Sequence, residues 1–198
     1  MYLLPQKRRE GYEFLLDVGL LSSSFFVVYG DGIVREETFN WGLGYIYALL
    51  TENLKVDYET AKELLMNVDV SRRSENKTAL TDELVSGYSA YSVDQIVKVG
   101  LDALCEEVDG FFEKYYRDKR AFVATNSMVV TGEGVGQIRG EFSYISAKLN
   151  RITELAYPEL PFFDKPKYSS RIALLNMSIG ERKKGFFNKI KNVFGGRK

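Results

Sequence analysis

The sequence predicts an α/β protein built from layers of strands and helices. Two short apolar segments and a third that alternates only loosely are expected to form strands, amphipathic segments with helical spacing follow, and strands and helices then alternate toward the C-terminus. The chain has 198 residues, of which 45% are hydrophobic and 27% are charged. This composition is that of a globular protein, and the length suffices for one domain core.

The first three strands are expected to form an antiparallel unit. Residues 13–18 and 24–29 are short, apolar and rich in Phe and Val, as buried strands are. Asp31-Gly32 is a strong signal for a two-residue hairpin, and it leads into a third strand, IVREETF. Two tight turns therefore connect these strands.

Helices are expected after the strands. A helix over residues 44–54 is followed by one over 57–67, for which Asp57 is a good N-cap. Ser92-Val-Asp-Gln95 has the pattern of a capping box, so a long amphipathic helix should begin there and end near Tyr116.

The second half of the chain continues the alternation. Residues 78–91 show no clear period and are expected to form an irregular strand. The segment SMVVTGEGVGQIRGE has the pattern of a strand that runs into a Gly-rich turn, before a helix over residues 139–150. A last strand near residues 152–156 and a helix at RIALLNMSI complete the body.

Two scarce residue types restrict the chemistry. The chain has no histidine, which excludes Ser-His-Asp and Cys-His nucleophile systems and the usual histidine metal sites. The single cysteine, Cys105, excludes an internal disulfide and lies on or beside the apolar face of the long helix, which indicates core packing. The apolar runs are too short to span a bilayer and the N-terminus lacks the pattern of a secretory signal, so a cytoplasmic location is expected.

The charge of the chain is concentrated at its C-terminus. Residues 181–198 carry seven Lys or Arg against Glu181, a net charge of +6. Because the whole chain is neutral, the first 180 residues carry −6. We therefore divide the chain into a body, residues 1–178, and a basic tail, residues 179–198.

The tail has the pattern of an amphipathic helix that lies in a membrane interface. Its apolar residues fall at helical spacing within an arc of about 120°, and its cations lie opposite or beside them. A disordered end, a helix in a partner's groove and a nucleic-acid contact are alternatives. A stripe of Phe side chains counts against disorder and nucleic acid, because contact with solvent or phosphate does not require it. The residues expected to bind an anionic membrane surface are Lys183, Lys184, Phe186, Phe187, Lys189, Ile190, Lys191, Val193 and Phe194.

Three segments of the body occur in a specific order: LLDVGLLSSSFFVVYGDGIV, FNWGLGYIYALL and VVTGEGVGQIRGE. They resemble the second phosphate hairpin, the Gly-rich entry to the next helix and the adenosine loop in the second domain of the actin, sugar-kinase and heat-shock-ATPase superfamily. Together with the basic tail, they most resemble FtsA, the bacterial actin homologue of cell division. The resemblance covers roughly residues 10–178. It implies an actin-like, ribonuclease H-like fold with a mixed sheet flanked by helices and a C-terminal amphipathic helix.

The resemblance also implies a nucleotide site. Asp17 would face Mg²⁺ through water, since the family places a carboxylate there. Backbone that approaches phosphate closely tolerates no side chain, and its N–H groups supply the dipoles. The nucleotide-binding residues implied in this way are Asp17, Gly19, Ser22, Ser23, Gly132 and Gly134.

Departures from the family pattern indicate weakened or absent binding of ATP and Mg²⁺. Leu20 and Leu21 stand where glycines are expected and would crowd the phosphates. Glu133 also replaces a glycine, and its carboxylate would repel polyphosphate. The family's Ala-Glu-x-x-Lys pattern is not kept either, because residues 61–65 read AKELL. The superfamily's first domain has no counterpart in this sequence, so ATP hydrolysis is not expected from it alone.

Three functions follow as hypotheses. The first is an FtsA-like scaffold, able to self-associate, that ties a tubulin-like FtsZ partner to the inner face of the membrane. The second is an ATP-binding or ATPase module that uses Asp17 and needs a first domain. The third is an adaptor of another envelope machine, such as a pilus platform. The altered nucleotide motifs and the tail favour the first, for which no catalytic residue and no metal ligand is expected.

Overall fold

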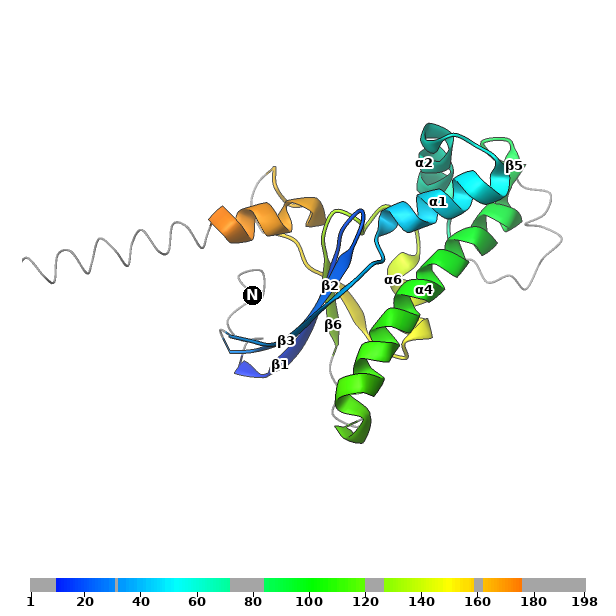
Figure 1. Cartoon of the computed structure of the whole chain (residues 1–198). Coiled ribbons are helices and arrows are strands. Elements are labelled where there is room, and N and C mark those ends of the chain that lie inside the picture. Colours follow the sequence, from blue (N-terminus) through cyan, green and yellow to red (C-terminus); the bar gives the residue numbers. More distant parts are fainter. Residues whose placement is uncertain (1–9, 31, 72–83, 120–126, 159–161, 176–198) are drawn as a thin grey trace, which may run out of the picture.

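The computed structural model describes residues 10–30, 32–71, 84–119, 127–158 and 162–175, and Figure 1 shows their arrangement. A five-stranded sheet runs through the body in the order β3-β2-β1-β6-β7. The first three strands pair antiparallel, whereas β6 is parallel to both of its neighbours. The α/β class and the antiparallel unit are thus confirmed. The strands are β1 (Tyr12–Val18), β2 (Ser23–Tyr29), β3 (Gly32–Phe39), β6 (Met128–Thr131) and β7 (Thr153–Leu155).

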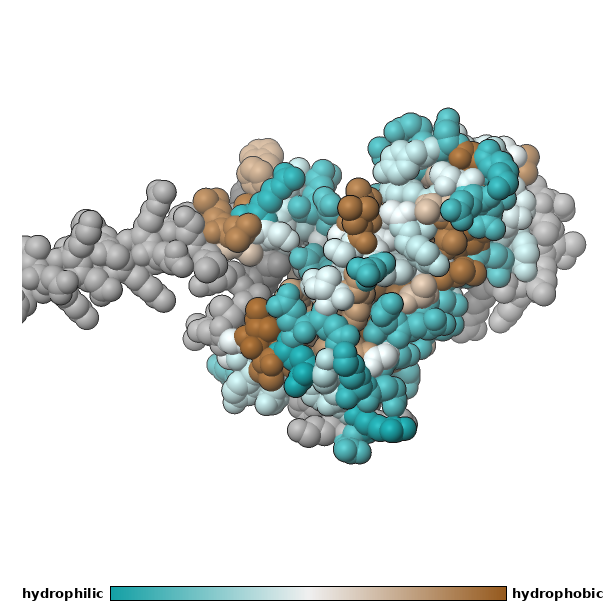
Figure 2. All heavy atoms as spheres, in the orientation of Figure 1, coloured by the Kyte–Doolittle hydropathy of each residue, from teal (hydrophilic) through white to brown (hydrophobic). Residues whose placement is uncertain are grey.

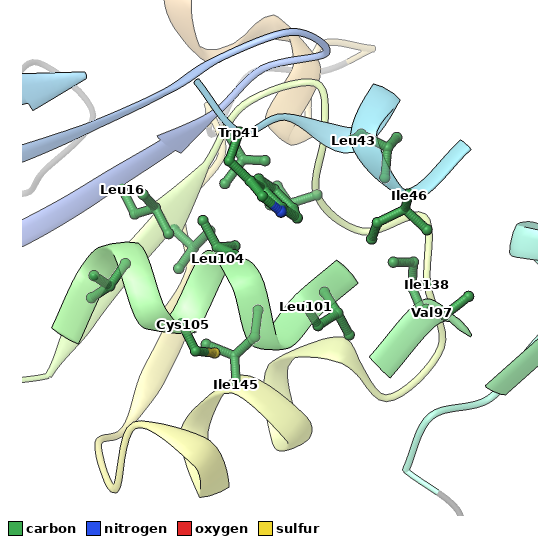
Figure 3. Close-up of a cluster of buried hydrophobic side chains, with 14 of the residues drawn as sticks. Leu16, Trp41, Leu43, Ile46, Val97, Leu101, Leu104, Cys105, Ile138 and Ile145 are labelled. Carbon is green, nitrogen blue, oxygen red and sulfur yellow. The ribbon is translucent and has the colours of Figure 1, made fainter. Parts of the chain in front are cut away.

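Helices pack against one face of this sheet. Alternate residues of β1, Phe14, Leu16 and Val18, point to that face and are almost completely buried. Figure 3 shows Leu101, Leu104 and other side chains of the long helix packed with residues from its neighbours. The main hydrophobic core therefore lies between the sheet and the helices. The helices are α1 (Leu43–Leu54), α2 (Tyr58–Asn67), α4 (Ala90–Tyr116) and α6 (Glu141–Lys148).

Cys105 and Trp41 both belong to this core. Cys105 is buried on α4 beside Ile145 of α6, so the prediction of core packing is confirmed. Trp41 is also buried, and its indole N–H donates a hydrogen bond to the carbonyl oxygen of Gly100 at 2.9 Å. This bond ties the entry of α1 to the middle of α4.

The N-terminus of α2 confirms one predicted cap, and that of α4 corrects another. The side chain of Asp57 accepts a hydrogen bond from the backbone N–H of Thr60 at 2.8 Å. The long helix does not begin at Ser92 as predicted, because Ser89 is its N-cap and accepts from the N–H of Ser92. Of the expected irregular strand, residues 78–83 lie outside the described residues. The described part forms a small hairpin, β4 (Leu84–Val85) and β5 (Tyr88–Ser89), which leads directly into the helix, so the helix begins earlier than predicted.

The chain leaves the sheet after β7. It passes through a short 3-10 helix, η4 (Pro166–Tyr168), into helical residues 169–175 (Figure 1). Another 3-10 turn, η3 (Arg117–Lys119), follows α4. Within the described ranges, no helix has both the length and the hydrophobicity needed to cross a bilayer. The basic tail, including all nine residues expected to bind membrane, lies outside the described residues.

Candidate functional site

Asp17 lies where the two central strands of the sheet end. It pairs with Thr131 of the parallel strand β6 on one side and with Ser24 of β2 on the other. In open α/β sheets, ligands bind at the carboxyl ends of parallel strands. The carboxylate is therefore at the edge of the sheet where a ligand site is expected.

The turn between β1 and β2 holds the start of α1. The N–H of Leu43 donates to the carbonyl oxygen of Gly19 at 3.0 Å, and that of Gly44 donates to Leu20 at 2.8 Å. These are N–H groups of the first helical turn, which have no partner within the helix. At Gly42 a Cβ atom would lie 2.4 Å from the carbonyl oxygen of Leu20, so only glycine permits this approach. The fold thus requires the Gly-rich entry to α1.

The predicted adenosine loop packs against the end of β1. Gly132 has a φ of +110°, and a Cβ atom there would lie 2.2 Å from the carbonyl oxygen of Val18. The N–H of Gly134 donates to the same oxygen at 2.8 Å. Both glycines therefore have a role in the fold whether or not a nucleotide binds.

Glu141, the first residue of α6, holds the other end of this loop. Its buried carboxylate accepts hydrogen bonds from the backbone N–H groups of Gly136 and Ile138. Burial raises the pKa of Glu141 to about 7, although the two hydrogen bonds act in the opposite direction. Glu141 is not among the residues predicted from the sequence, because an acidic side chain at the start of a helix is normally exposed and favourable there.

A cavity of about 340 Å³ opens beside Asp17. It contains three of the six predicted nucleotide-binding residues, Asp17, Gly19 and Ser22, and it also contains Glu133. Its other residues were not predicted from the sequence, and three of them come from the segment after β7. No sequence pattern indicated that this segment returns to a strand about 150 positions earlier. The lining residues are Asp17, Gly19, Ser22, Ser24, Glu133, Lys167, Ser170 and Arg171.

Serines of helical residues 169–175 attach this segment to the site. The hydroxyl of Ser170 donates to Oδ2 of Asp17 at 3.3 Å, and the hydroxyls of Ser169 and Thr131 are hydrogen-bonded at 2.6 Å. Ser169 is completely buried. These bonds place the cations Lys167 and Arg171 at the cavity.

Two of the expected site features lie elsewhere than at the cavity. Ser23 does not line the cavity, because it is buried and its hydroxyl donates to the carbonyl oxygen of Trp41 at 2.7 Å. Leu20 and Leu21 do not crowd the cavity either. Neither lines it, and Leu21 is 82% exposed while the backbone of Leu20 caps α1. Glu133 does line the cavity and its negative charge acts on Asp17, and the repulsion of polyphosphate by Glu133 stays a prediction.

The cavity is lined by two acidic and two basic residues. Burial raises the pKa of Asp17 and the negative charge of Glu133 raises it further, whereas the hydrogen bond from Ser170 lowers it. Two carboxylates and several hydroxyls form a donor set that suits Mg²⁺ held largely through water. Lys167 and Arg171 suit an anion, but a polyphosphate would face both carboxylates.

Comparison with solved structures places this arrangement among known folds. No protein-family model matches the chain, and the curated proteins also gave no match. MreB5 of Spiroplasma citri bound to AMPPNP is similar, with a TM-score of 0.64 at 13% identity over 92% of this chain and 56% of that one. The PilM-PilN type IV pilus biogenesis complex is similar with a TM-score of 0.59 at 14% identity. The match covers 83% of this chain and 45% of that one. The ethanolamine utilization protein EutJ from Carboxydothermus hydrogenoformans is similar with a TM-score of 0.54 at 14% identity. The match covers 80% of this chain and 48% of that one.

The chain therefore has the fold of the actin-like ATPase superfamily. The expected mixed sheet flanked by helices is confirmed, and the similar structures are actin-like proteins. At such low identity the likeness shows the fold alone. The chain spans about half the length of the solved structures described above.

Proposed function

We propose that this chain is an FtsA-like scaffold that holds a protein partner at the inner face of a cell membrane and has a weak nucleotide site. The actin-like fold, the altered cavity and the basic tail support this function. The observation that carries the proposal is the cavity itself. Glu133 lines this cavity together with Asp17, and Glu133 stands at a position where the family has glycine.

The cavity favours scaffolding over nucleotide hydrolysis for an electrostatic reason. At an effective dielectric constant of about 20, two unit charges 4 Å apart interact by about 4 kcal/mol. Even at twice that separation the repulsion between Glu133 and a phosphate is about 2 kcal/mol, or about thirtyfold in affinity. The cations Lys167 and Arg171 offset part of this cost, so binding is weak rather than excluded.

The tail supplies the membrane attachment. Its Phe side chains would insert into the interface, and each Lys or Arg near an anionic leaflet contributes about 1 kcal/mol. One such helix binds reversibly, and self-association of the body would add avidity. By resemblance, the partner held at the membrane is a tubulin-like FtsZ.

Calorimetric titration with Mg-ATP tests the weak nucleotide site. We expect a dissociation constant above about 1 mM for the unaltered chain and at least tenfold tighter binding for Glu133→Gln, which removes the charge and keeps the volume. Asp17→Ala is the matched control for binding at this cavity. Micromolar binding by the unaltered chain that Asp17→Ala abolishes would instead favour the ATP-binding module.

A pilus-type adaptor is the second candidate, because the PilM-PilN complex is among the similar structures. The two candidates differ in their partner. We expect the full chain to retain FtsZ in a pull-down from purified components. Retention of a PilN-type protein and no retention of FtsZ would replace the division scaffold by the pilus adaptor.

A further inference from the structure

The last described segment, which precedes the tail in the sequence, exposes several large apolar side chains. We refer to residues 162–175 as the C-terminal patch. Phe162 is 92% exposed, Leu174 68% and Leu175 53%, and Phe163 is also exposed. Figure 2 shows hydrophobic atoms where Figure 1 draws helical residues 169–175, beside hydrophilic atoms of the same region. Large apolar side chains gathered in this way mark a site of interaction.

The C-terminal patch is also basic, unlike the other residues that the structure describes. It carries Lys165, Lys167 and Arg171 against the single acid Asp164. The other described residues carry ten Lys or Arg and twenty Asp or Glu. A negatively charged surface would therefore attract this patch and repel the remainder of the described body.

We propose that the C-terminal patch is a second membrane contact, which binds an anionic lipid surface together with the tail. This inference rests on the proposed function, because the tail must first bring the body to the membrane. Phe186 of the tail follows Leu175 by 11 positions, so an extended connection reaches at most about 40 Å. The tail would thus keep this patch within about 40 Å of the lipid that it binds.

Exposed apolar and cationic side chains in one segment are what a membrane interface binds. Phe and Leu gain free energy in the acyl boundary, and Lys and Arg remain at the headgroups. A protein partner would more often bury such a patch with few charges at its centre. The contact also orients the body, because α2 lies at the opposite end of the molecule from residues 169–175 (Figure 1). The cavity at Asp17 shares Lys167 and Arg171 with this patch.

Sedimentation of the full chain with vesicles of phosphatidylglycerol and phosphatidylcholine tests this contact. We expect the double variant Phe162→Glu, Leu175→Glu to bind vesicles at least tenfold more weakly. It adds two negative charges at the membrane surface, and each charge there changes the binding constant about fivefold. Met66→Glu is the matched control, because Met66 is 55% exposed on α2 and should have no effect. Equal binding by the double variant and the unaltered chain would overturn the inference and leave the tail's role intact.

A position-specific label gives a readout that does not depend on charge reversal. Cys105 is buried and burial raises its pKa to about 12, so an engineered cysteine should be the residue that reacts. We expect an environment-sensitive dye at Leu175→Cys to shift to the blue with anionic vesicles, and the dye at Met66→Cys to stay unchanged. Bound protein whose dye at position 175 does not respond would contradict the second contact. Failure of the unaltered chain to sediment would instead refute the proposed function.

Discussion

Replacing Gly132 by alanine tests the geometry of the candidate site most severely. An alanine would adopt a φ of +110°, a region that L-residues rarely enter, and its Cβ would lie 2.2 Å from the carbonyl oxygen of Val18. Strain of about 1–3 kcal/mol adds to the loss of the bond from Gly134 to this oxygen, worth about 1 kcal/mol. We expect the free energy of unfolding to fall by about 3 kcal/mol, with the shift of β1 and the loop included.

Urea denaturation of Gly132→Ala and Gly136→Ala separates strain from steric contact. Gly136 also has a positive φ, +77°, but a Cβ atom there would meet nothing within 4 Å. Its alanine variant should therefore lose only about 1 kcal/mol, the cost of the left-handed conformation. Equal losses at the two positions would refute the close approach of the loop to β1. The glycines would then have to be explained by a ligand.

Three further predictions concern buried groups. Because burial raises the pKa of Glu141 from 4.5 to about 7, the folded chain binds the proton more tightly than the unfolded chain, and the free energy of unfolding should fall by about 3 kcal/mol between pH 4.5 and 7. Urea titrations of Glu141→Gln should lack this fall, and an unchanged pH slope would contradict its burial. Cys105 should react with a thiol reagent only after unfolding, so rapid modification of the folded chain would count against its packing. Trp41→Phe should cost about 1–3 kcal/mol in urea through loss of the bond to Gly100, and an unaltered midpoint would exclude that bond.

Local signals predicted much of the fold. The Asp31-Gly32 turn and the apolar runs beside it predicted the antiparallel unit, and Asp57 predicted the start of α2. The predicted start of α4 was wrong because two serines three positions apart, Ser89 and Ser92, both suit an N-cap. The hairpin that leads into the helix, which has no strong local signal, decides between Ser89 and Ser92.

The candidate site could be predicted only in part. Asp17 and its turn were found because residues 15–32 resemble the second phosphate hairpin of the actin-like superfamily. The contribution of Ser170 was not, because it depends on a contact between residues 153 positions apart in the chain. Leu20 was expected to face the cavity because of its place in the turn. Its carbonyl oxygen instead accepts a hydrogen bond from the first turn of α1, and Leu20 does not line the cavity.

Binding of the full chain to anionic vesicles tests the central claim, that the tail attaches this actin-like body to a membrane. Phe187→Glu places a charge in the apolar stripe of the tail, and Met66→Glu makes the corresponding change on α2. We expect the unaltered chain and Met66→Glu to sediment with phosphatidylglycerol vesicles, and Phe187→Glu to remain in the supernatant. An unaltered chain that stays in the supernatant, or a Phe187→Glu variant that sediments as well as the control, would contradict the account.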